Sequence, residues 1–567
     1  MSASVKATSL PTRRCAAGDG RLVLPGRAIG GALRTLATRL APRLALPGIE
    51  TRCKALRPAP KNKSLPLRNE NDGKTCGCIT CQLFGDLYPA EEDARERGGA
   101  ASRLWISDAY VTGPEQQAHV RDGVGLSRDA GAAARNIKFD FETAPRGTRF
   151  DLRLRLVDDD WPASELGAQL LSATLAEWES GRGRFGAGAA RGLGAFKLNN
   201  IQYLKPRLDD VDDLLAYLAA DEPRRAGVDD ATHWAQALTA ARQARRSVSG
   251  ETLPVARGFI AVSFTLECDG PLLRHDSLVA LLSGFDHAPQ LETAVGTTGL
   301  PVLSGGSLRG ALRTHAEKIA RTLWSLHWPA AEFLARCPAC HPLARNTRAP
   351  LASCDARLTT PTDQEAAEDD LCLGCRLFGS TRRGSRLWVD DAHWAGAQPT
   401  ETTCKAQDFL AIDRFTGGGQ DGAKFDAAAL VGARFAARIT LHSPRAWELG
   451  WLALTLRDLC DGRIRLGFGA AKGYGQARAV GLTWQLGSLA DDDLPCDAAL
   501  LAGGQPDGIH TVCTRAAAEM TEQLQAWASQ FLAQRESYQP SAKCPPPQSD
   551  TFTQPAESLY GPARSGR

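Results

Sequence analysis

The stretch Leu303-Ser-Gly-Gly-Ser-Leu-Arg-Gly-Ala-Leu-Arg-Thr314 is a glycine turn that leads directly into a helical pattern. A second copy, Leu24-Pro-Gly-Arg-Ala-Ile-Gly-Gly-Ala-Leu-Arg-Thr35, aligns with it without a gap, so that Gly26 corresponds to Gly305. Glycine lets the backbone approach a ligand closely, and a helix start offers unpaired N–H groups and a positive dipole end to an anion such as phosphate. For either copy alone, the alternative is a tight strand-to-helix turn that binds no ligand.

Further landmarks recur in the same order in both halves of the chain. In the first and second copy they are Gly77-Cys-Ile-Thr-Cys-Gln-Leu-Phe-Gly85 and Leu371-Cys-Leu-Gly-Cys-Arg-Leu-Phe-Gly379, Ser102-Arg-Leu-Trp-Ile-Ser-Asp-Ala109 and Ser385-Arg-Leu-Trp-Val-Asp-Asp-Ala392, Lys138-Phe-Asp140 and Lys424-Phe-Asp426, and the glycine-rich segments 181–194 and 462–475. The order indicates a tandem duplication of one domain of roughly 200 residues, at the upper end of ordinary domain sizes.

Composition limits the class of protein. The 567 residues are 43% hydrophobic, enough to bury two or three cores. A net charge of +3 neither requires nor excludes a nucleic-acid partner. Sixteen cysteines, seven of them in short CxC or CxxC clusters, favour metal binding in a reducing cytoplasm over a disulfide framework. Because the sequence lacks both a membrane-length apolar run and a secretory signal, we expect a cytoplasmic protein with no membrane partner.

Each copy reads strand, helix, strands, helix, strand. This α+β order suits a ferredoxin-like (RRM-like) sheet. In the second copy the first strand is predicted at Phe259-Ile-Ala-Val-Ser-Phe-Thr-Leu266, whereas only twenty-five residues precede Gly26 in the first, so its first strand is predicted to be short, missing or encoded upstream. The predicted domains are a first repeat at 1–208, a helical linker at 209–255, a second repeat at 256–486, and a C-terminal region at 487–567 with a helix at 514–535 and a disordered tail from residue 537.

Each repeat contains a cysteine cluster inserted between its first helix and its next strand. The predicted ligands are Cys53, Cys76, Cys78 and Cys81 in the first repeat and Cys337, Cys340, Cys372 and Cys375 in the second, with Cys354 or His341 as a substitute in the latter. Four thiolates complete the tetrahedral shell that zinc prefers and leave no position for water, so two structural zinc sites are predicted. Reduced structural cysteines or redox pairs are the alternative, since the two CxxC pairs of the second repeat are 31 residues apart.

These motifs together resemble the repeat-associated mysterious protein (RAMP) superfamily. The resemblance includes G-x-S-L-R-G-A-L-R, C-x-x-C-x-L-F-G, Ala411-Ile-Asp-Arg-Phe-Thr-Gly417 and Gly467-Phe-Gly-Ala-Ala-Lys-Gly-Tyr-Gly475. More narrowly, the chain is similar to the backbone subunit of type III CRISPR effector complexes, in a fused double-repeat form of the type III-D kind. The resemblance implies a ferredoxin-like core in each repeat, a role in antiviral defence, and three partners: CRISPR RNA, target RNA paired to it, and the other effector subunits.

A phosphate-binding groove is expected from the glycine turns and the cations near them. Guide pairing would supply sequence selection, so the protein needs only backbone and shape contacts. A solvated surface is the alternative reading of these arginines. The predicted RNA-binding residues are Gly26, Arg27, Arg34, Arg128, Arg182, Arg184 and Arg191 in the first repeat and Gly305, Ser307, Arg309, Arg313, Arg414, Arg463, Arg465 and Lys472 in the second.

In this family, target cleavage depends on an aspartate in the loop between the first strand and the glycine turn. A carboxylate there could hold Mg²⁺ or orient the ribose 2′-hydroxyl. The second repeat offers Asp286 and Glu292 as catalytic candidates, although the family position falls nearer Gln290. In the first repeat, Asp19 is too close to Gly26 and is expected to form an Asp-Gly turn.

Two function classes follow from these observations. One is a guide-directed, metal-dependent endoribonuclease, and the other is a non-catalytic RNA-binding subunit that leaves chemistry to other subunits. A third, a CRISPR RNA-processing nuclease, would use a histidine, and neither His287 nor His315 has a counterpart in the first repeat.

Overall fold

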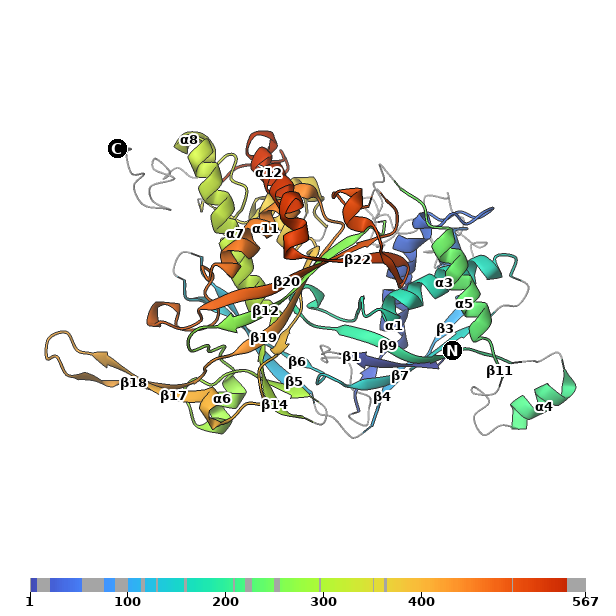
Figure 1. The fold of residues 1–567 in the computed structure, drawn as a ribbon, viewed down its shortest axis with the longest axis horizontal. Coiled ribbons are helices and arrows are strands. Elements are labelled where there is room, and N and C mark those ends of the chain that lie inside the picture. The colour runs from blue at the N-terminus through green and yellow to red at the C-terminus, as the bar shows by residue number, and fades with distance from the viewer. Residues whose placement is uncertain are drawn as a thin grey trace.

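The structure is a computed structural model that describes residues 2–7, 21–53, 76–86, 100–113, 118–128, 131–157, 161–206, 210–219, 227–248, 255–294, 297–349, 351–361, 365–491 and 493–547. It is a mixed α/β structure with two large antiparallel sheets, one from each sequence repeat, lying side by side (Figure 1). Asp19 and the basic loop 54–75 lie outside the described residues.

The first sheet contains the short strand that the sequence left open. Its strand order is β2 (Val23–Leu24), β4 (Ala109–Thr112), β7 (Arg149–Leu156), β1 (Ser2–Ala7), β9 (Ala195–Gln202) and β8 (Gly183–Arg184), and β3 (Leu104–Ile106) also pairs with β7. Strand β1 is six residues long and lies between β7 and β9. Strand β7 buries Phe150, Leu152 and Leu154 and alternates them with more exposed residues, as a half-buried strand does. Helices α1 (Gly26–Leu40) and α3 (Ser164–Glu179) contribute Leu33 and Leu171 to the same core.

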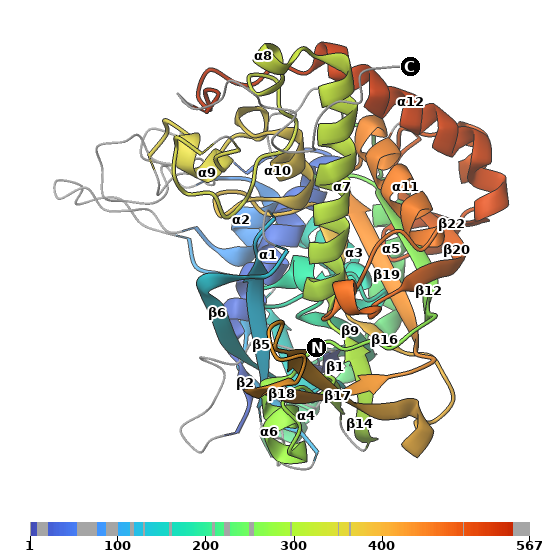
Figure 2. The same ribbon diagram turned by 90° about the vertical axis from the view of Figure 1, so that its left-hand side faces the viewer.

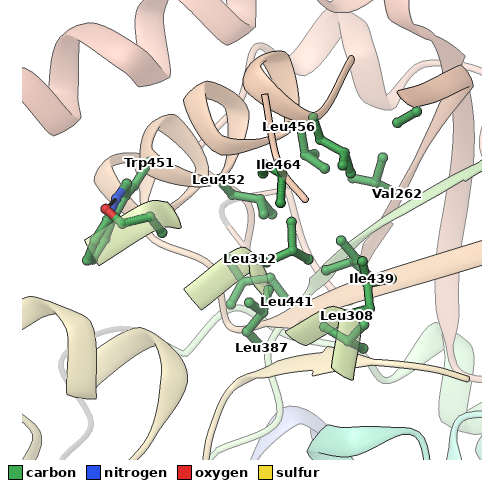
Figure 3. Close-up of a cluster of buried hydrophobic side chains, with 14 of the residues drawn as sticks. Val262, Leu308, Leu312, Leu387, Ile439, Leu441, Trp451, Leu452, Leu456 and Ile464 are labelled. Atoms are coloured by element: carbon green, nitrogen blue, oxygen red, sulfur yellow. Dashed lines mark hydrogen bonds between the residues drawn. The ribbon is translucent and has the colours of Figure 1, made fainter. Parts of the chain in front are cut away.

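The second sheet is larger. Its order is β13 (Leu291–Ala294), β14 (Thr297–Leu303), β16 (Ala392–Trp394), β19 (Arg434–His442), β12 (Phe259–Cys268), β20 (Ala477–Ser488), β22 (His510–Ala516) and β21 (Gln505–Asp507), and β15 (Leu387–Val389) pairs with β19. Helices α7 (Gly305–His327) and α11 (Ala446–Cys460) pack on it. Leu312 of α7 and Leu456 of α11 meet Val262 and Ile439 of the sheet in a closed apolar core (Figure 3).

The C-terminal region differs from its prediction. Residues 510–516 form strand β22, which extends the second sheet, and helix α12 starts at Thr521 rather than at 514 and ends at Ser537. This helix lies beside α11 (Figure 2) and places Trp527 and Phe531 in the core of the second repeat. Residues 538–547, predicted to be disordered, form a C-terminal strap in which Cys544 is buried, and residues 548–567 lie outside the described part of the chain. Apolar burial explains the difference, since these side chains would otherwise face water.

The predicted linker contributes to the first repeat's core. It contains α4 (Val211–Ala219), β11 (Val228–Asp229), which pairs with β10 (Leu204–Lys205), and α5 (Ala231–Gln243). Trp234, Ala237 and Ala241 of α5 are buried in the core of the first repeat, whereas α4 buries no residue. The domain boundaries given above stay predictions. Among the described helices, none combines the length and apolar character needed to cross a bilayer.

Each repeat also has a long β-hairpin. Hairpin one is β5 (His119–Leu126) with β6 (Ala133–Thr143), and hairpin two is β17 (Cys404–Ile412) with β18 (Gly419–Leu430). Hairpin two extends away from the body at the left of Figure 1, next to the short helix α6 (Ser277–Ser283). Hairpin one contacts the second repeat: Arg121 Nη1 is 2.6 Å from Asp391 Oδ2. The two hairpins are thus equivalent in sequence order but differ in their surroundings.

Candidate metal centres and repeat junction

The first cysteine cluster unites all four residues predicted for it. Cys53, Cys76, Cys78 and Cys81 are buried, and their sulfur atoms lie within 4.8 Å of one another. Cys78 precedes the helix α2 (Ile79–Phe84), where its sulfur accepts the backbone N–H of Cys81 at 3.4 Å. The helix start therefore orients two thiols toward the same point, and the four-sulfur set fits a tetrahedral ion.

The second cluster corrects one predicted ligand. The sulfur atoms that lie within 4.8 Å of one another belong to Cys340, Cys354, Cys372 and Cys375. Cys337 points elsewhere, because its thiol donates to the carbonyl of Ala339 at 3.3 Å. Cys354 takes its place from the first turn of the short helix α9 (Cys354–Arg357), and its sulfur accepts the N–H of Cys372 at 3.3 Å. The substitute ligand considered from the sequence is thus the one brought into the cluster.

His341 does not join this cluster. Its Nδ1 lies 3.1 Å from the backbone nitrogen of Leu343, and its Nε2 lies 3.4 Å from that of Arg128 in hairpin one. Both ring nitrogens therefore face backbone amides. Each cluster consists of four sulfurs, a donor set that suits Zn²⁺ and leaves no open position for water.

Arginines face the sulfur atoms in both clusters. Arg34 Nη2 is 3.3 Å from Cys81 Sγ, and its repeat counterpart Arg313 has Nη2 3.6 Å from Cys375 Sγ. Four thiolates and one divalent ion carry a net charge of −2, so a nearby guanidinium lowers the cost of burying them. The second cluster has one more such contact, from Arg357 Nη2 to Cys354 Sγ at 3.7 Å. The structure thus places two predicted RNA-binding arginines against the metal centres.

A buried carboxylate joins the two repeats beside the second cluster. Glu317 of α7 has no exposed surface and contacts Arg313 at 2.7 Å, Arg128 at 3.0 Å and Arg321 at 3.5 Å. Burial raises the pKa of Glu317, but the three guanidinium groups outweigh it and lower that pKa overall. Arg128 comes from hairpin one. This predicted RNA-binding residue therefore holds the first repeat against the second.

Arg309 is also turned inward. Its guanidinium donates to the carbonyl of Phe378, in the helix α10 (Leu373–Phe378) that carries Cys375. Burial, together with the charges of Arg313 and Arg191, lowers the pKa of Arg309 to about 9. We call the residues that carry the four sulfurs of a cluster a cysteine module. In the described structure both Arg309 and Arg313 thus hold α7 to the second cysteine module.

In both repeats an aspartate side chain accepts the N–H of the glycine that starts the helix. The N–H of Gly26 donates to Asp108 Oδ1 at 2.6 Å, and the N–H of Gly305 donates to Asp391 Oδ1 at 2.8 Å. A Cβ on Gly26 would lie 2.4 Å from the carbonyl oxygen of Ile106, so only glycine fits against the neighbouring strand. Close helix-to-strand packing accounts for these glycines. Whether they also contact RNA stays a prediction, as it does for Ser307, whose N–H faces Ser304 Oγ at 3.4 Å.

Two arginines of the first glycine-rich loop connect the repeats. Arg182 contacts Glu177 at 2.6 Å and Asp507 at 2.7 Å, and Arg184 contacts Asp390 at 3.0 Å. The other predicted cations lie on the surface: Arg27, Arg191, Arg414, Arg463, Arg465 and Lys472 are exposed. Of these, Arg463 pairs with Asp461 at 3.1 Å. Among the described residues, no carboxylate forms an ion pair with the other five.

The two predicted catalytic acids have different environments. Asp286 is exposed, and it exchanges two hydrogen bonds with Asp426 of hairpin two: each backbone N–H donates to the other's carboxylate, at 2.8 and 3.0 Å. Glu292 is buried between Arg146 at 3.1 Å and His393 at 3.3 Å. Burial raises the pKa of Glu292, and these two partners outweigh it, lowering that pKa overall.

Gln290, the residue nearest to the predicted family position, is only 1% exposed, and neither of its side-chain amide atoms has a hydrogen-bond partner among the described residues. Within the described ranges, the two cysteine clusters are the only groups of three or more potential ligands close enough to share an ion. No described acidic metal site therefore surrounds Asp286 or Glu292.

Two kinds of residue that the structure shows to be important were not predicted from the sequence. Asp108 and Asp391 occupy the same place in a repeated landmark, so their recurrence was a usable signal of a shared structural role. Glu317 had no such signal, because Thr38 stands at the equivalent place in the first repeat.

Two sheets built from repeated elements, each with a four-cysteine insertion, define a tandem-repeat α/β protein with two candidate metal centres. The family model of the RAMP superfamily matches residues 16–197 and 265–478, which together exceed half of the chain. The chain therefore belongs to the RAMP superfamily, and membership indicates a CRISPR-associated RNA-binding subunit. A search of curated proteins finds no match.

Proposed function

We propose that this chain is a CRISPR RNA-binding backbone subunit of a type III effector complex, in a double-repeat form of the type III-D kind. Its main support is the RAMP superfamily match across both repeats. Guide RNA, target RNA and the other effector subunits are its proposed partners. The protein would bind the guide's sugar-phosphate backbone and leave sequence selection to base pairing.

Strand order supports a ferredoxin-like core in each repeat. The central strands β9-β1-β7-β4 and β20-β12-β19-β16 both read fourth, first, third, second in a strand-helix-strand-strand-helix-strand unit. The same elements therefore occupy the same places in both sheets. Such a unit is also the architecture of RNA-recognition modules.

The proposed metal is zinc, in two structural sites. Four sulfurs from helix starts and neighbouring loops meet in each site, from one helix start in the first site and from two in the second, and zinc bound there would fix the loop inserted after the first helix. The ligand residues are Cys53, Cys76, Cys78 and Cys81 in one site and Cys340, Cys354, Cys372 and Cys375 in the other.

The proposed RNA-binding surface contains five exposed cations that lack a carboxylate partner among the described residues: Arg27, Arg191, Arg414, Arg465 and Lys472. Unpaired cations suit phosphates, because RNA binding then releases counterions without breaking an ion pair. The inward-facing Arg309 and Arg313 are instead proposed to position α7.

The test is a binding titration of the purified chain with labelled guide-length RNAs of unrelated sequence over a range of salt concentrations. We expect similar affinities for all sequences and a linear fall of log K with log salt. Affinity for one sequence only, or no salt dependence, would contradict a backbone-binding role.

Guide-directed cleavage of target RNA is the second candidate function, and the exposed carboxylate of Asp286 is the observation that favours it. Asp286→Asn should then slow cutting about 100-fold in magnesium while RNA binding is retained. Glu292→Gln serves as the comparison, because that carboxylate is buried between Arg146 and His393. If the wild-type complex cuts no target, the non-cleaving role holds.

A further inference from the structure

A basic residue of the closing glycine loop lies over a phenylalanine of the hairpin in each repeat. Arg191 Cζ is 5.9 Å from the ring centroid of Phe139. Lys472 Nζ is 4.6 Å from the ring centroid of Phe425. Both phenylalanines belong to the repeated Lys-Phe-Asp landmark, and both cations precede a glycine in the same loop. The same cation–ring contact occurs in both repeats although the surrounding residues differ. It is therefore a shared structural feature of the repeat.

The backbone presents both cations in the same way. Arg191 and Lys472 each end a short 3₁₀ turn between two glycines with positive φ, at 81° and 90° in the first repeat and 75° and 83° in the second. Only glycine adopts such angles without strain. The turn therefore directs the cation toward the hairpin in both repeats.

The rings restrain the two cationic side chains, and the N–H groups of these side chains stay available for hydrogen bonds. Cation–π attraction reduces the freedom of a surface side chain without using its N–H groups. In the second repeat, Phe409 and Phe468 add two more rings around Lys472, at 4.8 and 5.5 Å. Both cations are exposed, and no described carboxylate pairs with either. In the first repeat Phe139 is itself 42% exposed.

We propose that Phe139 with Arg191, and Phe425 with Lys472, form two equivalent cation–ring sites, one per repeat, that bind single-stranded RNA. At each site the cation receives a backbone phosphate, and the ring positions that cation. At the first site the exposed part of Phe139 also contacts a base. Exposed rings beside free cations are the surface that binds single strands without sequence preference. This inference rests on the proposed RNA-binding function and adds residues to it.

The chain contains a matched control pair. Arg155 Cζ is 5.4 Å from the ring centroid of Trp105, and both residues are exposed. This pair lies on β7 and β3 of the first sheet rather than on a glycine loop and a hairpin. It has the same kind of contact and the same charge, without the proposed site around it.

The experiment measures binding of the full-length chain to labelled oligouridine by fluorescence anisotropy over a range of salt concentrations. We expect Arg191→Met and Lys472→Met each to weaken binding about 3- to 10-fold and to reduce the slope of log K against log salt by about 0.7. Phe139→Leu and Phe425→Leu should weaken binding about 2- to 5-fold and leave that slope unchanged, since no charge is lost. Arg155→Met and Trp105→Leu should bind within about twofold of wild type.

Three outcomes separate the possibilities. If Arg155→Met weakens binding as much as Arg191→Met, the effect is general charge and the proposed sites are wrong. If wild type binds but the variants at both sites keep its affinity and slope, these sites are again wrong and the RNA-binding function stands. If wild type binds neither oligouridine nor guide RNA, the proposed function itself fails. Arg191→Met and Lys472→Met alter exposed side chains, so their melting temperatures should match wild type and keep the comparison valid.

Discussion

The two repeats share their elements but differ in what their hairpins contact. Hairpin one lies against the second repeat, where Arg128 reaches Glu317 at 3.0 Å and Asp122 accepts the N–H of Ser277 at 2.8 Å. Hairpin two extends outward, and Phe415 at its tip is 100% exposed. The same element thus joins two domains in one repeat and stays on the surface in the other. The helix that receives the turn of hairpin one has the matching acid: α7 has Glu317, which contacts Arg128, where the equivalent position of α1 has Thr38.

The largest effect that we expect is from loss of a metal ligand. Cys81→Ser and Cys354→Ser should each remove one of two bound zinc ions, and a structural site of this kind contributes on the order of 10 kcal/mol to folding. Elemental analysis of chelator-free protein gives the ion count, and thermal melting gives the stability. Cys337→Ser should keep both ions, because its thiol faces Ala339. Loss of an ion in that control would restore the ligand set predicted from the sequence.

Next in size is the carboxylate at the repeat junction. Glu317→Ala leaves three guanidinium groups around a buried gap, so we expect a loss of about 3–5 kcal/mol in the free energy of unfolding. The matched change in the first repeat, Thr38→Ala, removes one hydrogen bond to the carbonyl of Arg34 and should cost about 1 kcal/mol. Urea unfolding measures both. Equal losses would show that the two helices do not differ in this respect.

A second buried acid tests the junction from the side of the first repeat. Glu177 contacts Arg182 at 2.6 Å and His510 at 3.0 Å. Burial raises its pKa, but His510 and Arg182 outweigh burial and lower it overall. Its stabilisation is therefore complete above the ordinary glutamate pKa of 4.5 and is lost as the pH falls through the lowered folded value. Glu177→Gln should cost about 2 kcal/mol at neutral pH.

The pH dependence separates this charge effect from a packing defect. The difference between wild type and Glu177→Gln should shrink as the pH falls below about 4.5, since glutamine does not titrate. Urea unfolding at several pH values measures the difference. A constant gap from neutral to acidic pH would mean that packing, rather than the carboxylate charge, is responsible.

The smallest effect compares the two metal centres. Arg34→Met removes the arginine that faces Cys81, and we expect zinc release from the first site to become about 10-fold faster. Arg313→Met should have a smaller effect on the second site, because Arg357 still faces Cys354. Release to a coloured chelator measures both rates. A larger change with Arg313→Met would reverse the order given by the arginine contacts.

Much of the fold followed from repeated local patterns. The alternation at 150–154 placed the face of β7, and the repeated C-x-x-C-x-L-F-G located both cysteine modules. Cys354 was predicted only as a substitute, because Cys337 forms a CxxC pair with Cys340 whereas Cys354 stands in no such pair. The roles of Arg309 and Arg313 depend on which groups the fold brings near them. An arginine can face a phosphate, a carbonyl or a thiolate, and residue type alone does not distinguish these partners.

The C-terminal strap affects how this chain is made. Residues 538–547 close over the second cysteine module: Ser541 Oγ donates to Asp370 at 2.7 Å, and Arg357 donates to the carbonyl of Pro545 at 2.7 Å. On the ribosome, the four cysteines of the first module have all emerged early, whereas the second module waits for a segment translated long after Cys375. Domains generally fold from the N-terminal side during synthesis. We therefore expect the first module to capture its ion before the second, which is completed only after residues 538–547 have emerged.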